Sequence, residues 1–392
     1  MNDTKLISQG SYGCMFKPGF TCNGKIEDNE KYITKVQKKK KTSDNETEIG
    51  KKIKKIKNYR KYYAPIIESC EVNIHKITKK QEIEKCNFID TKKEEVYESN
   101  KITYVGKETL ADYYSNNLNN ANQILTSMLE QQMVLLEGLD KLANQKIIHL
   151  DLKSNNIMIN AESRPIIIDF GLSFETNDLE KENYEKIFFV YGPDYGPWCI
   201  DITMICYICN EMGDNWREEE VTIETIEKVV NEYVKKNTMI NRHFTQEEQE
   251  EYTENMMGYF QKKQTTGEKM VREILEKGET WDNYALNVIY LELFRNLQLS
   301  NYKEFHFIQE YEQILKRELK VVPSERNSIK ENMRLIHKIF SNIPKKEYNT
   351  FLISLSKSLD SKKIKKGIKK QIYSSQIKES QEEKKMYRYL FV

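Results

Sequence analysis

The feature that most constrains this chain is the stretch IIHLDLKSNNIMIN at residues 147–160. It places a histidine, an aspartate, a lysine and two asparagines at fixed spacing between two apolar runs rich in isoleucine. This pattern predicts the end of a strand or helix, a tight loop that displays side chains, and then a second strand. Because loops held between rigid elements often carry chemistry, we expect this loop to have partners elsewhere in the chain.

Length and charge limit the possible functions. The chain has 392 residues and 39% hydrophobic content, which is ample for a core and too long for one small domain. Its 62 Lys and Arg residues nearly balance its 60 Asp and Glu residues, so no global field favours nucleic acid or membrane surfaces. We therefore expect two lobes, no specific nucleic-acid partner and no membrane partner.

The cysteines and the apolar stretches favour an intracellular setting. The seven cysteines are odd in number and widely spread, and the first ten residues contain no apolar signal core. The most apolar stretch, residues 198–209, carries Asp201 and is too short to span a bilayer. We therefore expect no disulfide framework, a reducing environment and a cytoplasmic protein. Cys206 and Cys209 have the spacing of half a zinc site, but no second pair lies nearby.

Secondary-structure signals divide the chain into an α+β layout of two lobes and a tail. Residues 1–105 read as short strands plus one helix, in which Ile49 and Ile53 share an apolar face. Residues 106–340 read as mostly helical, and 121–145 has the apolar spacing of a long buried helix. Residues 341–392 form a helical or charged tail.

The polar residues of the opening stretch suit phosphoryl transfer, which needs positioned phosphates and metal and one carboxylate to orient the incoming hydroxyl. Asp151 would orient that hydroxyl and accept its proton. Lys153 would stabilise the transferred phosphoryl group, and Asn156 would reach a metal ion. In IIIDFG at 166–171, Asp169 ends a buried strand, where its carboxylate would bind Mg²⁺ that bridges nucleotide phosphates.

Three upstream segments supply the remaining parts. ISQGSYGCMF offers a glycine-containing turn whose backbone N–H groups could lie over phosphates. Lys35, in YITKV, would touch the α- and β-phosphates, and Glu46 would pair with Lys35 from the helix that follows. The candidate phosphate-binding residues of the turn are Ser8, Gly10, Ser11, Tyr12 and Gly13.

Taken together, these segments resemble the signature set of the protein kinases. HLDLKSNN is similar to the family's H-R-D-L-K-x-x-N, DFG matches its D-F-G, SQGSYGCM is similar to its glycine loop, and YITK corresponds loosely to its V-A-I-K. The resemblance implies a bilobal fold with ATP and Mg²⁺ between a small β-rich lobe and a larger helical lobe. A lysine at position 153 is typical of serine/threonine kinases, so the resemblance implies transfer of the γ-phosphate of ATP to a protein substrate.

The same resemblance implies the glutamate that pairs with Lys35 and the residues of the hinge. The family places apolar residues three and seven positions after the paired glutamate, which favours Glu46 over Glu48. ITYVGKETL resembles the hinge between the lobes. It implies adenine contacts from the backbones of Thr103 and Val105, with Ile102 guarding the pocket.

Departures from the family pattern are also informative. Leu150 replaces the arginine that receives an activation-loop phosphate in many kinases, so we do not expect that mode of switching. VYGPDYG at 190–196 lies where the family has A-P-E. Asp194 would then replace the glutamate of that motif and pair with Arg326.

The next family landmark, D-x-[WY]-x-L-G, has two candidates, Asp201 and Asp282. WDNYALNVIYLEL, which contains Asp282, matches better although Asn287 replaces the glycine. Choosing Asp282 makes residues 203–279 a helical insertion, on which a partner could dock. The insertion and the glycine-turn segment resemble the divergent kinases of large cytoplasmic DNA viruses, which would place the protein in the host cytoplasm or the virion.

Two other functions remain open. A pseudokinase would be a binding module without chemistry, but all four residues whose loss is usual are present, namely Lys35, Asp151, Asn156 and Asp169. A small-molecule kinase of the aminoglycoside or choline type usually lacks the lysine at position 153 and the glycine of D-F-G, both found here.

Overall fold

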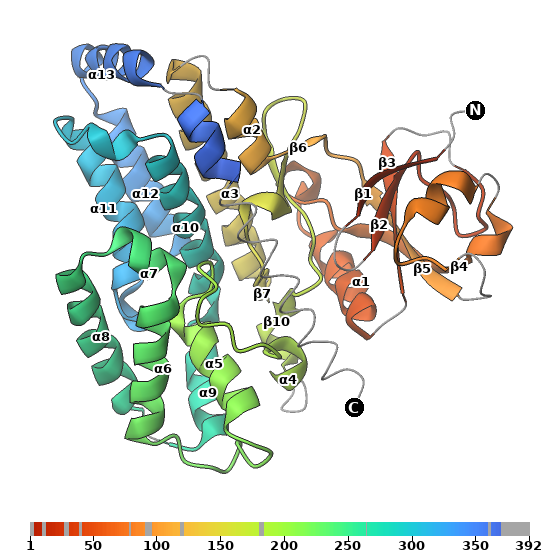
Figure 1. Cartoon of the computed structure of the whole chain (residues 1–392), viewed down its shortest axis with the longest axis horizontal. Helices are drawn as coiled ribbons and strands as arrows, with labels where there is room; N and C mark the ends of the chain where they lie inside the picture. Colours follow the sequence, from red (N-terminus) through yellow and green to blue (C-terminus); the bar gives the residue numbers. More distant parts are fainter. Residues whose placement is uncertain are drawn as a thin grey trace.

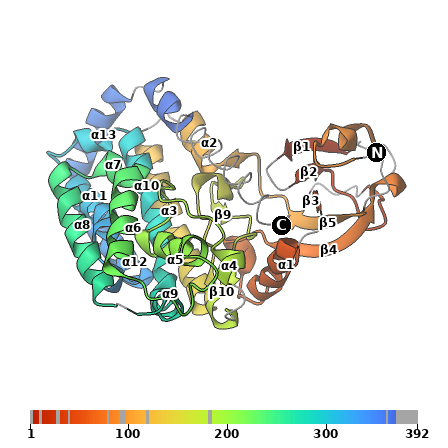
Figure 2. The same cartoon turned by 60° about the horizontal axis from the view of Figure 1, so that its bottom comes forward.

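The chain folds into a small β-rich lobe and a larger helical lobe (Figure 1). Both views place the sheet at one end of the molecule and the helices at the other (Figure 2). The predicted two-lobed α+β architecture is therefore confirmed. The computed structural model describes residues 4–9, 13–26, 31–38, 41–77, 80–90, 96–117, 121–179, 184–263, 265–359 and 362–369.

The small lobe is an antiparallel sheet with the strand order β1–β2–β3–β5–β4. Helix α1 (Lys41–Ile53) packs beside strand β4, with Ile49 and Ile53 buried as their spacing predicted. Because β3 has a partner on both sides, Lys35 is held near the middle of the sheet. The strands are β1 (Lys5–Gln9), β2 (Cys14–Lys17), β3 (Tyr32–Lys38), β4 (Ile66–Asn73) and β5 (Val96–Thr103).

Four of the seven cysteines form two disulfides in this lobe, Cys14–Cys86 and Cys22–Cys70. The expectation that the chain lacks disulfides is therefore wrong, and the inference of a reducing setting loses its basis. The pairs are 72 and 48 residues apart, and only the folding of the sheet brings them together. The other three, Cys199, Cys206 and Cys209, take no part in these disulfides and are buried in the large lobe.

Reduction of the disulfides is expected to destabilise the small lobe. A disulfide restricts the unfolded chain and typically contributes about 2–4 kcal/mol, so dithiothreitol should lower the melting temperature of this lobe. In denaturant without reductant, iodoacetamide should label only the three cysteines outside the disulfides, and after reduction all seven. Labelling of seven cysteines without reductant would show that the disulfides do not form in solution.

The large lobe consists mainly of helices around α3 and α10, with short strands on the side that faces the small lobe (Figure 1). The predicted long helix is α3. The helices are α2 (Leu110–Asn116), α3 (Ala121–Asn144), α4 (Tyr184–Ile187), α5 (Ile200–Glu211), α6 (Ile223–Lys236), α7 (Thr238–His243), α8 (Gln246–Gln261), α9 (Gly267–Leu275), α10 (Trp281–Asn296), α11 (His306–Lys320), α12 (Ile329–Ser341) and α13 (Lys345–Ser358), followed by a helical segment at 362–369.

The short strands form two small sheets, β6–β8–β9 and β7–β10, and they flank the stretch that opened the sequence analysis. Among the residues that the structure describes, no helix is long and apolar enough to cross a membrane. The strands are β6 (Glu108–Thr109), β7 (Ile147–Ile148), β8 (Ile157–Ile159), β9 (Pro165–Ile167) and β10 (Phe174–Glu175).

Helix α10 forms the centre of the large lobe. Every residue from Trp281 to Phe294 is buried, including polar ones such as Asp282. Full burial of a large apolar side chain contributes roughly 1.5–3 kcal/mol, so this helix is a major source of stability.

Helices α6 to α9 lie between α5 and α10 in the chain and occupy most of the predicted insertion at 203–279.

Candidate active site

The predicted catalytic loop lies between β7 and β8, and a buried carboxylate holds its backbone. Leu150 has φ 66°, a left-handed conformation that costs energy for a non-glycine residue. The Asp282 carboxylate accepts hydrogen bonds from the backbone N–H groups of His149 (2.7 Å) and Leu150 (3.0 Å). Burial raises the pKa of Asp282, whereas His149 and the two N–H groups oppose that rise. Asp282, the preferred of the two candidates, is therefore the residue that anchors the loop.

Asp151 is held through both of its carboxylate oxygens. Asn156 donates through Nδ2 to Asp151 Oδ2 at 2.9 Å and to the Asp151 carbonyl at 2.9 Å. Lys153 Nζ lies 3.1 Å from Oδ2. The hydroxyl of Tyr195 donates to Oδ1 at 3.0 Å. The loop thus brings together Asp151, Lys153 and Asn156 as their spacing predicted, and Tyr195 joins them from a segment that sequence analysis did not connect with Asp151.

The DFG segment presents Asp169 to the space between the lobes and buries Phe170. Asp169 has φ 62°, and its side chain is 40% exposed. Phe170 is buried between the rings of His149 and Tyr63, at centroid distances of 5.0 Å and 6.2 Å. The Tyr63 hydroxyl in turn donates to the carbonyl of Gly138 in α3. Phe170 therefore fixes the turn that directs the Asp169 carboxylate outward.

Lys35, Glu46 and Asp169 form a charged network across the two lobes. Lys35 Nζ lies 3.1 Å from Glu46 Oε2 and 3.5 Å from Asp169 Oδ1. Burial alone would lower the pKa of Lys35, but Asp169 and Glu46 raise it well above its ordinary value. Lys35 in turn lowers the pKa of Asp169, so that carboxylate stays ionised. The structure pairs Lys35 with Glu46, and Glu48 instead contacts the exposed Lys51.

Helix α1 is tied directly to the segment that follows DFG. Asn45 donates through Nδ2 to the carbonyl of Ser173 at 2.7 Å, and Lys52 forms an ion pair with Glu175. These contacts hold α1 close to the large lobe. As a result, Glu46 is in place to bind Lys35.

An apolar cluster lies beside the predicted hinge. Ile102, at the end of β5, packs with Ala64, Ile66 and Ile166, and partly buried side chains including Val105 lie against them. Thr103 ends β5. Apolar side chains suit the flat faces of a purine ring, and adenine binding by the backbones of Thr103 and Val105 stays a prediction.

The glycine turn is described only in part. Gly10, Ser11 and Tyr12 lie outside the described residues, whereas Ser8 is in β1 and Gly13 precedes β2. A Cβ atom on Gly13 would lie 2.3 Å from the carbonyl oxygen of Val36, so any side chain there would force the strands apart. Gly13 therefore allows the backbone at this position to approach β3 closely.

Asp169 and Asn156 fit a hard divalent cation. Asn156 uses Nδ2 to hold Asp151, which leaves its amide oxygen as a potential ligand, and Asp169 supplies an ionised and partly exposed carboxylate. Carboxylate and amide oxygens are the donors that Mg²⁺ prefers.

One predicted contact is wrong. The carboxylate that binds Arg326 is Asp201, not Asp194, and Arg326 Nη2 lies 2.7 Å from Asp201 Oδ2. Both side chains are 1% exposed. Asp201 stands in the first turn of α5, and Arg326 precedes α12. Sequence spacing misplaced this contact because Asp194 lies only seven residues earlier in a segment without regular secondary structure.

Comparison with known proteins agrees with this geometry. The family model described as the protein kinase domain matches residues 2–196. A probable cyclin-dependent serine/threonine-protein kinase of Dictyostelium discoideum is 32% identical over 117 residues, which is 26% of this chain and 8% of that protein. The probable serine/threonine-protein kinases samkA and mkcD of the same organism are 48% and 43% identical over 11% and 14% of this chain, and over 7% and 8% of their own lengths.

The matched segments therefore span less than a tenth of each of these relatives. The family match covers the small lobe, the catalytic loop and the DFG segment, and it stops before α5. The two-lobed fold is the fold of that family. The chain therefore contains a protein kinase domain of the eukaryotic type.

Proposed function

We propose that this protein is an ATP-dependent serine/threonine protein kinase. The observation that carries the proposal is the set of contacts among five side chains, with Asp169 close enough to the catalytic loop to feel the charge of Lys153. Lys35 is paired with Glu46 and Asp169, and Asp151 is held by Asn156. Each of these residues is of the type that its role in phosphoryl transfer requires.

Each residue has a stated role in the proposed transfer. The acceptor hydroxyl donates its proton to Asp151 as its oxygen bonds to the γ-phosphorus and the bond to the β-phosphate oxygen breaks, which releases ADP. Lys153, 3.1 Å from Asp151, offsets the charge of the transferred group. Lys35 binds the α- and β-phosphates. Asp169 and Asn156 would hold Mg²⁺, which neutralises phosphate charge when bound.

Specificity for serine and threonine is part of the proposal. It rests on Lys153 and on the relatives, which are named as probable serine/threonine-protein kinases and match over short segments. The helices between α5 and α10 and the sequence of the glycine turn support a further proposal, namely that the chain is related to the divergent kinases of large cytoplasmic DNA viruses.

Replacement of Lys35 tests the nucleotide site. Lys35→Met should reduce transfer of labelled γ-phosphate to a generic serine/threonine substrate by about 100-fold, because a buried cation that binds the phosphates is lost. Lys51→Met is the matched control, since Lys51 is 58% exposed and pairs with Glu48, three residues away on the same helix. Lys51→Met should transfer phosphate as fast as wild type. Chelation of divalent cations should abolish transfer by the wild type and by Lys51→Met.

The same assay separates the proposal from its rivals. If the wild-type protein transfers no phosphate to protein acceptors while ATP still raises its melting temperature, the kinase proposal is overturned and a pseudokinase is favoured. Transfer to aminoglycosides or choline, but not to protein, would instead favour a small-molecule kinase.

A further inference from the structure

A tyrosine from the segment between α4 and α5, residues 188–199, contacts the proposed catalytic carboxylate. The Tyr195 hydroxyl donates to Asp151 Oδ1 at 3.0 Å, and the Tyr195 side chain is buried. Asn156 and Lys153 contact Oδ2, and Tyr195 contacts the other oxygen, Oδ1. The three contacts together restrict rotation of the carboxylate about its terminal bond.

Tyr195 is itself held by its neighbours in the same segment. Its ring packs edge to face against Trp198, with centroids 5.3 Å apart and an interplanar angle of 80°. Trp198 donates through Nε1 to the carbonyl of Leu150 at 2.9 Å. The segment is therefore bound to the catalytic loop at two points, through Tyr195 at Asp151 and through Trp198 at Leu150.

The inserted helices support this segment from the other side. In α6, the Tyr233 hydroxyl donates to the carbonyl of Trp198 at 3.0 Å. Asn237, which caps α7, donates through Nδ2 to the carbonyl of Tyr195 at 3.5 Å. Both residues are fully buried, so these contacts are shielded from water. The segment is thus packed between the insertion and the catalytic loop.

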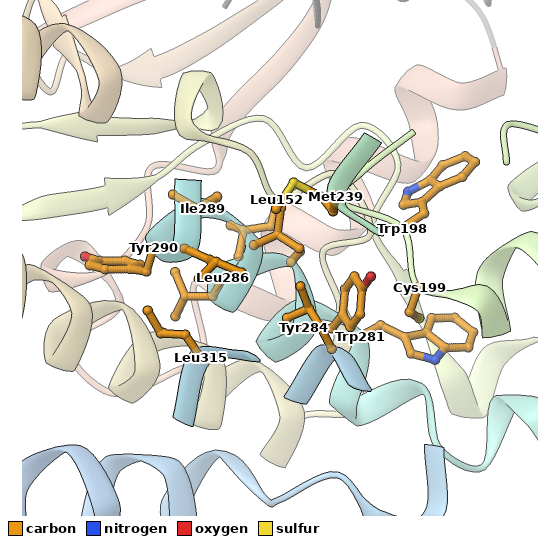
Figure 3. Packing of buried hydrophobic residues seen from close by; sticks show 14 of the residues in the cluster. Leu152, Trp198, Cys199, Met239, Trp281, Tyr284, Leu286, Ile289, Tyr290 and Leu315 are labelled. Atoms are coloured by element: carbon orange, nitrogen blue, oxygen red, sulfur yellow. The ribbon is translucent and has the colours of Figure 1, made fainter. Parts of the chain in front are cut away.

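Helix α7 approaches the segment closely at Gly196. A Cβ atom there would lie 2.8 Å from Met239 Cγ and 2.9 Å from Thr238 Oγ1. Met239 also belongs to the cluster that contains Leu152 of the catalytic loop and Tyr284 of α10 (Figure 3). The insertion therefore shares one continuous core with the catalytic loop.

We propose that Tyr195 is a positioning residue for phosphoryl transfer, that its hydroxyl orients the Asp151 carboxylate, and that α6 and α7 hold Tyr195 in place. The inference rests on the proposed kinase function. It assigns a role to the insertion. It also explains what holds the segment in place without an activating phosphate. Leu150 stands where many kinases have the arginine that binds such a phosphate.

The test compares two tyrosines of one segment. Tyr195→Phe removes the hydroxyl on Asp151, whereas Tyr191→Phe removes a hydroxyl that donates to Glu232 at 3.0 Å. We expect Tyr195→Phe to lower kcat by roughly 10-fold, the effect of losing one hydrogen bond to a charged group, with KM for ATP within twofold of wild type. Tyr191→Phe should keep both constants within about twofold of wild type.

A kcat for Tyr195→Phe equal to that of wild type would overturn the inference. A higher kcat would also overturn it, since Tyr195 would then obstruct the position of the acceptor hydroxyl. An inactive wild-type protein overturns the proposed function and the inference together, whereas an active wild type with an unaffected Tyr195→Phe variant overturns the inference alone.

A second variant tests the role of the insertion. Tyr233→Phe removes the hydrogen bond to the Trp198 carbonyl and the one to the Tyr284 hydroxyl, and it leaves the hydrogen bonds of Asp151 in place. We expect kcat to fall about threefold to 10-fold while KM for ATP is unchanged. A melting curve measured beside the assay verifies folding. A Tyr233→Phe variant with wild-type kcat would overturn the assignment of α6 as a support for Tyr195.

Discussion

The Asp151→Asn variant is expected to lose at least about 100-fold in phosphate transfer while it still binds ATP. Asparagine has nearly the shape of aspartate, so the contacts of Asn156 and Tyr195 with this side chain can largely persist. The amide cannot accept the proton of the acceptor hydroxyl. Turnover should therefore fall, while the proposed sites for the phosphates, at Lys35, and for the metal ion, at Asp169, should remain intact.

The measurement is transfer of labelled γ-phosphate to a serine/threonine substrate, together with ATP affinity measured by calorimetry. Asp214→Asn is the control, because Asp214 is an exposed carboxylate in the turn after α5. We expect Asp214→Asn to behave as wild type in both experiments. Turnover of Asp151→Asn within a few-fold of wild type would refute the role of Asp151 as the base, and loss of ATP binding would point to a structural role instead.

Much of the candidate site could be predicted from the sequence because its parts are local. Asp151, Lys153 and Asn156 lie within six residues, and their spacing alone places them on one loop. Asp169 follows a short strand of buried isoleucines, which fixes where its carboxylate appears. Glu46 was distinguishable from Glu48 because the apolar residues Ile49 and Ile53 define the buried face of α1.

The remaining contacts join distant parts of the chain through positions that no sequence pattern fixes. Tyr195 reaches Asp151 from 44 residues away, in a segment whose path depends on α6 and α7. Disulfide pairing was missed because cysteine count and spacing carry no information about which strands become neighbours. The buried ion pair of Asp201 could not be predicted either, because its partner Arg326 lies 125 residues later in the chain.

The largest effect on stability is expected for Arg326→Met. Arg326 and Asp201 are each 1% exposed, and burial alone would lower the pKa of Arg326, which Asp201 instead raises. Removing the guanidinium leaves an unpaired carboxylate in the core of the large lobe. Loss of one partner of a buried ion pair costs about 3–5 kcal/mol, which should appear as a lower melting temperature of this lobe.

A control variant tests whether the loss of stability depends on burial of the ion pair. Arg272→Met breaks the exposed pair with Glu268 in α9, where solvent screens the charges, and it should hardly change the melting temperature.

Within the described part of the chain, Asp201 Oδ1 and Arg326 Nε find no hydrogen-bond partner, so this buried pair is incompletely satisfied. Replacing both members with apolar side chains, as in Asp201→Leu with Arg326→Met, should therefore recover most of the lost stability. If the double variant melts as low as Arg326→Met, the loss comes from the contacts of Arg326 with Tyr284 and Thr280 rather than from an unpaired charge.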